Sequence, residues 1–212
     1  MRQLQLLVNI RRRSVQCIVR LIPVALLVVS ANASFSQDSQ PKSLVASAEP
    51  NNQDLPNFHQ VSGSLYRSGQ PTAEGMQQLK QLGVTTIINL RSFHSDRDEI
   101  CDTGLAYEHI YMKAWHPEKK EAVRFLQIVN DPKRTPILVH CHFGSDRTGA
   151  MVALYRMAIQ CWPKEEAINE MRSGGYGFNE IWFNLPLWLE SLDVAELRTR
   201  SGILIGPPPP VR

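Results

Sequence analysis

A ten-residue loop between a predicted strand and a predicted helix dominates this sequence. Residues 140–149 read HCHFGSDRTG and directly follow the apolar run Ile137-Leu138-Val139. Residues 148–157, which overlap the end of this loop, have the composition of a helix. In open α/β sheets, the loops at the carboxyl ends of strands form the ligand crevice. The segment therefore predicts a strand–loop–helix unit of an α/β fold, with chemistry in residues 140–149, the central loop.

The central loop carries a cysteine and an arginine separated by five residues, Cys141 and Arg147. A thiolate is a stronger nucleophile than a thiol, and a nearby cation and a helix N-terminus both favour it. Arg147 and the predicted helix would supply these two influences. Thr148 adds a hydroxyl that can donate a hydrogen bond to the sulfur, and His140 can orient the loop. We therefore expect Cys141 to act as a nucleophile.

The remaining loop residues suit an anion. Successive backbone N–H groups at a helix N-terminus form a concave site for phosphate. Gly144 lies mid-loop, where a side chain would obstruct close approach, and Arg147 can bind two phosphate oxygens at once. The implied reaction has two steps: Cys141 attacks phosphorus, and water then hydrolyses the phosphocysteine. The substrate-binding residues expected here are His142, Phe143, Gly144, Ser145 and Arg147.

The central loop resembles the signature of the cysteine-dependent protein tyrosine phosphatase superfamily, and most closely that of its compact dual-specificity-like branch. Residues 64–72, SLYRSGQPT, and 87–91, IINLR, are also similar to that branch. The likeness covers about residues 55–195. By this resemblance Cys141 is the nucleophile, Arg147 clamps the phosphate, Gly144 shapes the loop, and Thr148 assists the thiolate and the second step.

The general acid is not evident from the resemblance. The superfamily usually uses an aspartate on a separate loop, but the matching segment here, residues 112–118, reads MKAWHPE and has no aspartate. Asp146 is one candidate, because a carboxyl beside bound phosphate is favoured when protonated. It could instead turn outward to pair with a cation or cap the helix. Glu118 and His116 are alternative acids, although Glu118 could equally be a first-turn helix residue and His116 a solvated one.

A second charged segment follows the strand predicted at residues 84–90. Arg91 at its start could face the site or brace Asp146. For residues 94–99, HSDRDE, a solvated loop of mixed charge is the favoured interpretation.

Strands and helices alternate along the rest of the chain. The pattern predicts a strand pair over 61–67, strands at 84–90, 105–111 and 136–140, and helices at about 73–82, 118–130, 148–160 and from 163 and 180. It indicates an α/β fold in a single domain, with a central, mostly parallel sheet flanked by helices and the Cys-x5-Arg loop between strand and helix. No cluster has metal-ligand spacing, so we expect no metal and no cofactor.

The N-terminal segment predicts export. Residues 1–33 hold five arginines, no acidic residue, a short apolar core and the small-x-small site Ala31-Asn32-Ala33, as in a secretory signal peptide. The apolar core is too short for a membrane span, which needs about 20 residues, although an uncleaved membrane anchor is the alternative. Without residues 1–33 the formal charge changes from +3 to −2, which gives no indication of a nucleic-acid partner. We expect a periplasmic or extracellular protein without a stable membrane span.

The predicted organisation continues with a disordered linker at 34–54, rich in Ser, Gln, Asn, Pro and Ala. The phosphatase-like domain follows at 55–200 and a disordered, proline-rich tail at 201–212. Beyond the signal segment the cysteines are Cys101, Cys141 and Cys161. Cys101 and Cys161 could form a disulfide or remain two buried free thiols. The sequence does not indicate an oligomeric state.

These features predict a phosphomonoester hydrolase of the protein tyrosine or dual-specificity type, acting on a phosphorylated protein or a small phosphomonoester. An inositol phosphate or phosphoinositide phosphatase is the alternative. The loop lacks the lysines common in enzymes for highly phosphorylated lipids, which argues against this alternative. Some lipid-active phosphatases resemble this chain in having an aspartate at the position of Asp146, which argues for it. A phosphate-binding pseudo-phosphatase and a sulfurtransferase are more distant alternatives.

Overall fold

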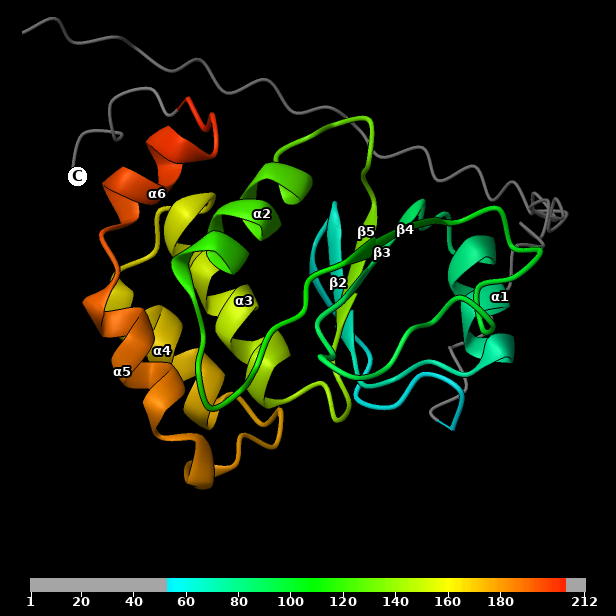
Figure 1. The fold of residues 1–212 in the computed structure, drawn as a ribbon, viewed down its shortest axis with the longest axis horizontal. Helices are drawn as coiled ribbons and strands as arrows, with labels where there is room; N and C mark the ends of the chain where they lie inside the picture. Colours follow the sequence, from blue (N-terminus) through cyan, green and yellow to red (C-terminus); the bar gives the residue numbers. More distant parts are fainter. Residues whose placement is uncertain (1–52, 205–212) are drawn as a thin grey trace, which may run out of the picture. The chain divides into compact units, whose positions relative to one another are not determined.

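A five-stranded sheet forms the centre of residues 53–204, the part of the chain that the computed structural model describes (Figure 1). Its strands are β1 (His59–Ser62), β2 (Leu65–Ser68), β3 (Thr86–Asn89), β4 (Ala106–His109) and β5 (Ile137–His140). Their order across the sheet is β1-β2-β5-β3-β4. Only the β1–β2 hairpin is antiparallel, and the other three pairings are parallel. The prediction of a mostly parallel central sheet is confirmed.

Helices cover both faces of the sheet, as Figure 1 shows: α1 lies on one side and α2 to α6 on the other. Their bounds are α1 (Ala73–Gln81), α2 (Lys119–Val129), α3 (Asp146–Ala158), α4 (Lys164–Ser173), α5 (Asn184–Ser191) and α6 (Val194–Arg200). A 3-10 turn, η1 (Glu180–Trp182), precedes α5. Thr72 caps α1 as its sequence position predicts, because its hydroxyl accepts a hydrogen bond from the Gly75 N–H.

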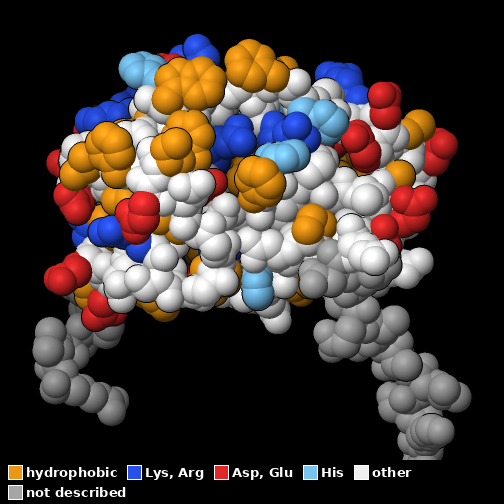
Figure 2. All heavy atoms as spheres, turned by 90° about the horizontal axis from the view of Figure 1, so that it is seen from below, with side chains coloured by type: hydrophobic (Ala, Val, Ile, Leu, Met, Phe, Trp, Pro, Cys, Tyr) orange, Lys and Arg blue, Asp and Glu red, His pale blue; other side chains and the backbone are white. Residues whose placement is uncertain are grey.

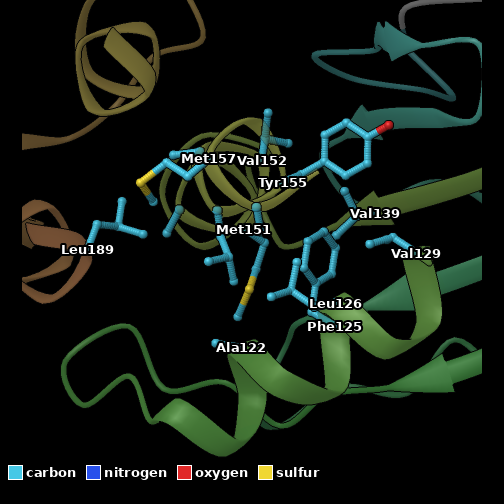
Figure 3. Close-up of a cluster of buried hydrophobic side chains, with 14 of the residues drawn as sticks. Ala122, Phe125, Leu126, Val129, Val139, Met151, Val152, Tyr155, Met157 and Leu189 are labelled. Carbon is cyan, nitrogen blue, oxygen red and sulfur yellow. The ribbon is translucent and has the colours of Figure 1, made fainter. Parts of the chain in front are cut away.

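The larger core lies between the sheet and the α2–α6 side. Figure 3 shows side chains from α2, α3, α5 and β5 meeting there, including Phe125, Met151, Val139 and Leu189. Eleven of the thirteen residues of α3 are buried. Nearly all-round burial requires an apolar helix, and it explains why the segment after the central loop has so few charged residues.

A smaller core lies between the sheet and α1. Met76 and Leu79 of α1 pack there with Ile87 of β3, Leu138 of β5 and Leu55. Together the two cores bury β3 and β5 on both faces, as expected for central strands of a parallel sheet.

Parallel pairing brings the carboxyl ends of three strands to one edge. His140, the last residue of β5, is opposite Ser68 at the end of β2 and Asn89 at the end of β3. The loops that follow these strands therefore start side by side, and one of them is the central loop.

Both predicted boundaries of the domain need correction. Asp54, placed at the end of the linker, accepts hydrogen bonds from the Thr72 hydroxyl and the Gln78 amide at α1. At the other end, Ser201 and Ile203 are buried, so the first residues of the predicted tail pack with the domain. Residues 34–52 of the linker, the predicted signal peptide and residues 205–212 of the tail lie outside the described residues.

Several helices also differ from prediction. Helix α3 begins at Asp146, two residues earlier than expected, and the segment from 180 divides into η1 and α5. Helix α6 was not predicted, although Asp193 caps it by accepting from the Glu196 N–H, a spacing typical of a helix start. Cys101 and Cys161 are free, and both are exposed rather than buried. Within residues 53–204, none of the helices has the length and apolar character needed to cross a membrane.

Candidate active site

Cys141 lies at the base of the central loop, immediately after β5, and only 1% of its surface is exposed. Because α3 begins at Asp146, its free backbone N–H groups and the positive end of its dipole face this loop. The central loop therefore joins a buried thiol to the N-terminus of a helix, the end that favours anions.

Gly144 is required by the shape of the loop. Its φ of +77° lies in the left-handed region, and a Cβ atom would be 2.5 Å from the Gly69 nitrogen and 2.6 Å from the Ser68 carbonyl carbon. The loop therefore packs, backbone on backbone, against the turn that follows β2. This close approach supports the predicted shaping role of Gly144.

Arg147 lies on the first turn of α3 and lines a cavity of about 270 Å³ together with His142, Phe143 and Asp146 of the central loop. Its Nη1 is 3.4 Å from the Leu90 carbonyl oxygen and 3.5 Å from that of Met112, both of which it approaches as a donor. These two long contacts orient the guanidinium without neutralising its charge. The fork is therefore available for an anion in the cavity.

The cavity is lined by two arginines and three large aromatic side chains. Figure 2 views this face, where Lys, Arg and His side chains gather in the middle with hydrophobic side chains around them. The residues that line the cavity are Arg91, Ser92, Phe93, Ala114, His142, Phe143, Asp146, Arg147 and Trp182. Phe93 and Phe143 are 85% and 68% exposed, an unusual solvent contact for large apolar rings that points to a binding surface.

A second arginine, Arg67, holds the backbone of the central loop. Arg67 on β2 is 1% exposed, and its Nη2 donates to the Gly144 carbonyl at 2.7 Å. Its guanidinium also lies over the Tyr176 ring, 3.8 Å from the centroid. Burial lowers the pKa of Arg67 to about 10, although Tyr176, Glu170 and Cys141 act to raise it. Arg67 is therefore still charged at neutral pH, and its charge-assisted hydrogen bond holds the Gly144 carbonyl of the central loop.

This role of Arg67 was not predicted from the sequence. Arg67 lies near the carboxyl end of β2, and only the pairing of β2 with β5 shows that this end lies where the central loop begins.

His140 is held by a buried carboxylate. Its Nε2 is 2.7 Å from Asp96 Oδ2, and neither side chain has any exposed surface. Burial acts to raise the pKa of Asp96, but the hydrogen bonds from His140 and Gln70 and the charges of His140 and His94 outweigh it, so the pKa is lowered. The residue that holds His140 therefore comes from residues 94–99, which were predicted to form a solvated loop. That prediction is wrong for Asp96, which is completely buried.

Asp146 is the only acid candidate that lines the cavity within the described residues. It is buried, and both of its carboxylate oxygens accept hydrogen bonds: Oδ1 from the Asn179 N–H at 2.9 Å and Oδ2 from the Ser145 hydroxyl at 3.1 Å. It therefore neither turns outward to a cation nor contacts Arg91. It also ties the segment before η1 to the start of α3.

Glu118 and His116 lie elsewhere. Glu118 is the N-cap of α2, where its N–H donates to Glu121, and it forms an ion pair with Lys120. The hydrogen bond from Lys120 lowers the pKa of Glu118, which disfavours the protonated form that an acid needs. His116 is exposed and bonds to Lys113 through its backbone N–H. Neither residue lines the cavity.

Thr148 differs from expectation. Its hydroxyl oxygen is buried and has no hydrogen-bond partner among the described residues, so the predicted bond to the Cys141 sulfur is not formed. The hydroxyl is close to the site in sequence and fold, and its assisting role remains a prediction.

Three groups that could together hold a metal ion lie beside the site: His94, Asp96 and Glu99. Asp96 already accepts hydrogen bonds from Asn89, Gln70 and His140, so its oxygens are committed to the protein. We therefore treat this group as part of the hydrogen-bond network around His140.

Comparison with known proteins agrees with this geometry. Residues 45–181 match the family described as "DSP-PTPase phosphatase fused to NAD+ Kinase". The chain is 30% identical over 146 residues to the dual specificity protein phosphatase TpbA of Pseudomonas aeruginosa, a match covering 67% of this chain and 65% of TpbA. It is 27% identical over 154 residues to the inositol diphosphatase DSP3 of Arabidopsis thaliana, covering 67% and 72% of the two chains.

Solved structures show the same fold. The crystal structure of TpbA superposes with a TM-score of 0.63 at 28% identity, over 69% of this chain and 91% of that chain. A variant of TpbA has been crystallised in complex with pTyr. The catalytic domain of the PP-IP phosphatase SIW14 of S. cerevisiae has a TM-score of 0.61 at 24% identity, over 70% and 94% of the two chains. By its match over residues 45–181, the chain belongs to the dual-specificity family of protein tyrosine phosphatases.

Proposed function

We propose that this protein is a phosphomonoester hydrolase of the protein tyrosine or dual-specificity type. The observation that carries the proposal is the arrangement of the central loop: the buried thiol of Cys141 lies at its start, α3 begins at Asp146, and the next loop residue, His142, lines one cavity together with Arg147. TpbA, which is similar in sequence and fold, is named a dual specificity protein phosphatase. The curated match spans 65% of its length, so activity is inferred here from the site.

The reaction proceeds in two displacements. In the first, the Cys141 thiolate attacks phosphorus, the bond to the leaving oxygen breaks, and that oxygen takes a proton from a general acid. The loop N–H groups and Arg147 stabilise the charge on the three other phosphoryl oxygens. In the second, water attacks phosphorus and loses a proton, inorganic phosphate leaves, and the thiolate is restored.

Asp146 is the proposed acid and base for these two steps. It lines the cavity, whereas Glu118 and His116 do not. General acids contribute factors of about 10²–10⁴, most for poor leaving groups. Asp146→Asn retains an oxygen for the Asn179 N–H but cannot carry the proton. We expect it to slow alkyl phosphates far more than para-nitrophenyl phosphate. Equal slowing of both substrates would exclude Asp146 as the acid.

Phosphotyrosine is the leading substrate class. Three aromatic side chains, Phe93, Phe143 and Trp182, line the cavity beside Arg147 and offer an apolar wall for a phenyl ring. A TpbA variant was crystallised with pTyr. Purified protein should hydrolyse phosphotyrosine with a higher kcat/KM than phosphoserine. A profile that favours phosphoserine or inositol phosphates over phosphotyrosine would contradict this assignment.

We further propose that the protein acts outside the cytoplasm, in the periplasm or medium. The support is the composition of residues 1–33, with five arginines, an apolar core and a small-x-small site. Cell fractionation and N-terminal sequencing test it: cleavage after Ala33 is expected, whereas a full-length chain in the membrane fraction would indicate the uncleaved anchor.

A further inference from the structure

Arg91 lines the same cavity as Arg147 but comes from a different part of the chain. Arg147 belongs to α3, whereas Arg91 follows β3 by two residues. Two guanidinium groups thus face one cavity from two elements. Among the described ion pairs, none involves either of them, so no carboxylate within 4 Å neutralises them.

The Arg91 side chain is held in place by neutral and buried groups. Its Nη1 donates to Gln70 Oε1 at 2.9 Å, and the Gln70 amide nitrogen donates to Asp96 Oδ1, also at 2.9 Å. Asp96 is completely buried and is fixed by Asn89 and His140. The Arg91 N–H also donates to Asn89 Oδ1 at 2.7 Å. A surface arginine with only solvent around it has no such support.

The second cation exceeds what a single phosphate monoester needs. The N–H groups at the start of α3 and the Arg147 fork already provide a complete set of donors for three phosphoryl oxygens. Arg91 belongs to a different element, the loop after β3. His142 lines the cavity with it and adds two ring nitrogens.

We propose that Arg91 binds a second anionic group of the substrate, a phosphoryl or carboxylate group adjacent to the scissile phosphate. The proposal rests on the proposed function and narrows its substrate class to phosphomonoesters that carry a second anionic group beside the scissile phosphate. Gln70 and Asp96 act as positioning residues, because they touch Arg91 or each other and not the cavity.

Competitive inhibition tests the proposal with simple probes. Inhibition of para-nitrophenyl phosphate turnover is measured with inorganic phosphate, which has one phosphoryl group, and with pyrophosphate, which has two. For the unaltered protein we expect pyrophosphate to inhibit more tightly. In Arg91→Gln the preference for pyrophosphate over phosphate should fall about tenfold, and Arg91→Lys should retain part of it because the charge is kept but the fork is lost.

Two further variants separate position from charge. Arg97 lies on the same loop but is exposed and does not line the cavity, so Arg97→Gln should retain the full preference. Gln70→Ala keeps the Arg91 charge but removes its support, and an intermediate loss is expected. Thermal unfolding of each variant establishes that it is folded at the assay temperature.

The outcomes are distinct. An unchanged preference in folded Arg91→Gln overturns the proposal, as does equal weakening of both inhibitors, which would place Arg91 on the scissile phosphate. Complete lack of phosphatase activity in the unaltered protein would instead overturn the proposed function, and direct binding of the two probes by calorimetry would still test Arg91.

Two further probes identify the source of the second anion. One is a phosphotyrosyl peptide with a glutamate beside the phosphotyrosine, compared with its glutamine analogue. The other is a small inositol diphosphate, compared with the corresponding monophosphate. Whichever pair loses its kcat/KM ratio in Arg91→Gln gives the source, and loss of neither ratio counts against the proposal.

Discussion

Gly144 is the residue at which the central loop tolerates least change. A Cβ atom there would overlap the backbone of Ser68 and Gly69, and neither neighbour can move as a flexible side chain would. The substitution must therefore displace the loop over Cys141. Displacements of about 1 Å in a catalytic geometry can reduce rates about 10²-fold.

Gly144→Ala should consequently lower kcat/KM for para-nitrophenyl phosphate at least about 100-fold. The matched control is Gly83→Ala: Gly83 also has a positive φ, +84°, but a Cβ there meets nothing within 4 Å. We expect Gly83→Ala to cost only about 1–2 kcal/mol of unfolding free energy and to keep activity. Similar activity in both variants would contradict the role assigned to Gly144.

A second prediction concerns the buried carboxylate of Asp96. It is buried and holds His140, Gln70 and Asn89, so Asp96→Asn leaves part of this network without its charged acceptor. Loss of a buried charge-assisted hydrogen bond costs about 1.5–3 kcal/mol. Urea unfolding at neutral pH should show a loss of this order.

The pH dependence of that loss has a defined sign. The pKa of Asp96 is lowered on folding, so its contribution is fully present above the unfolded value of about 3.9 and decreases as pH falls through the lower folded value. The difference between the two proteins should therefore shrink below about pH 4. A difference that grows on acidification would contradict the assignment.

Individual residues also show where sequence reasoning ends. The spacing of Cys141 and Arg147 predicts a nucleophile and a phosphate clamp because both belong to one continuous segment of the sequence. Arg67 and Asp96 are distant in sequence, and only the sheet brings them to His140 and Gly144. Their charge suggested solvent exposure, and burial could not be inferred without knowledge of their partners.

At the scale of elements, the N-terminus of α2 decides between two roles for Glu118. The structure makes Glu118 the N-cap of this helix, distant from the cavity lining and paired with Lys120. Glu118→Gln should therefore change kcat for para-nitrophenyl phosphate and for alkyl phosphates by less than about twofold, because no proton transfer step is lost.

The helix itself should depend on Glu121. The Glu121 carboxylate accepts the Glu118 N–H at 2.9 Å, and burial raises the pKa of this carboxyl. Glu121→Ala removes that acceptor and should cost about 0.5–2 kcal/mol of unfolding free energy.

For Glu118→Gln, a large loss of turnover confined to alkyl phosphates would contradict the prediction above and would identify Glu118 as a general acid.

Helix and strand positions were largely predictable, since apolar periodicity and caps such as Thr72 mark them. The two exceptions have different causes. Helix α6 is short, so it carries little periodic signal. Helix α3 begins inside the central loop at Asp146, so residues that were assigned to the phosphate-binding loop are also the first residues of the helix. A local sequence pattern cannot show where the loop ends and the helix begins when the same residues belong to both.

At the scale of the whole domain, the account depends on three strand ends meeting at one edge. Because β2, β5 and β3 are parallel neighbours, the turn at Gly69, the central loop and the segment at Arg91 converge. The fold class followed from the alternation of strands and helices, but the strand order did not, because side-chain patterns do not specify which strands pair. That order creates the cavity with two arginines.

The central claim is that Cys141 accepts the phosphoryl group. Rapid acid quenching of the protein during turnover of a phosphotyrosyl substrate, followed by intact-mass spectrometry and peptide mapping, measures this directly. We expect one phosphoryl group on Cys141, no adduct and no turnover in Cys141→Ser, and normal behaviour in Cys101→Ser, which changes an exposed free thiol. Undiminished turnover by folded Cys141→Ser, or a phosphoryl group on another residue, would contradict the account.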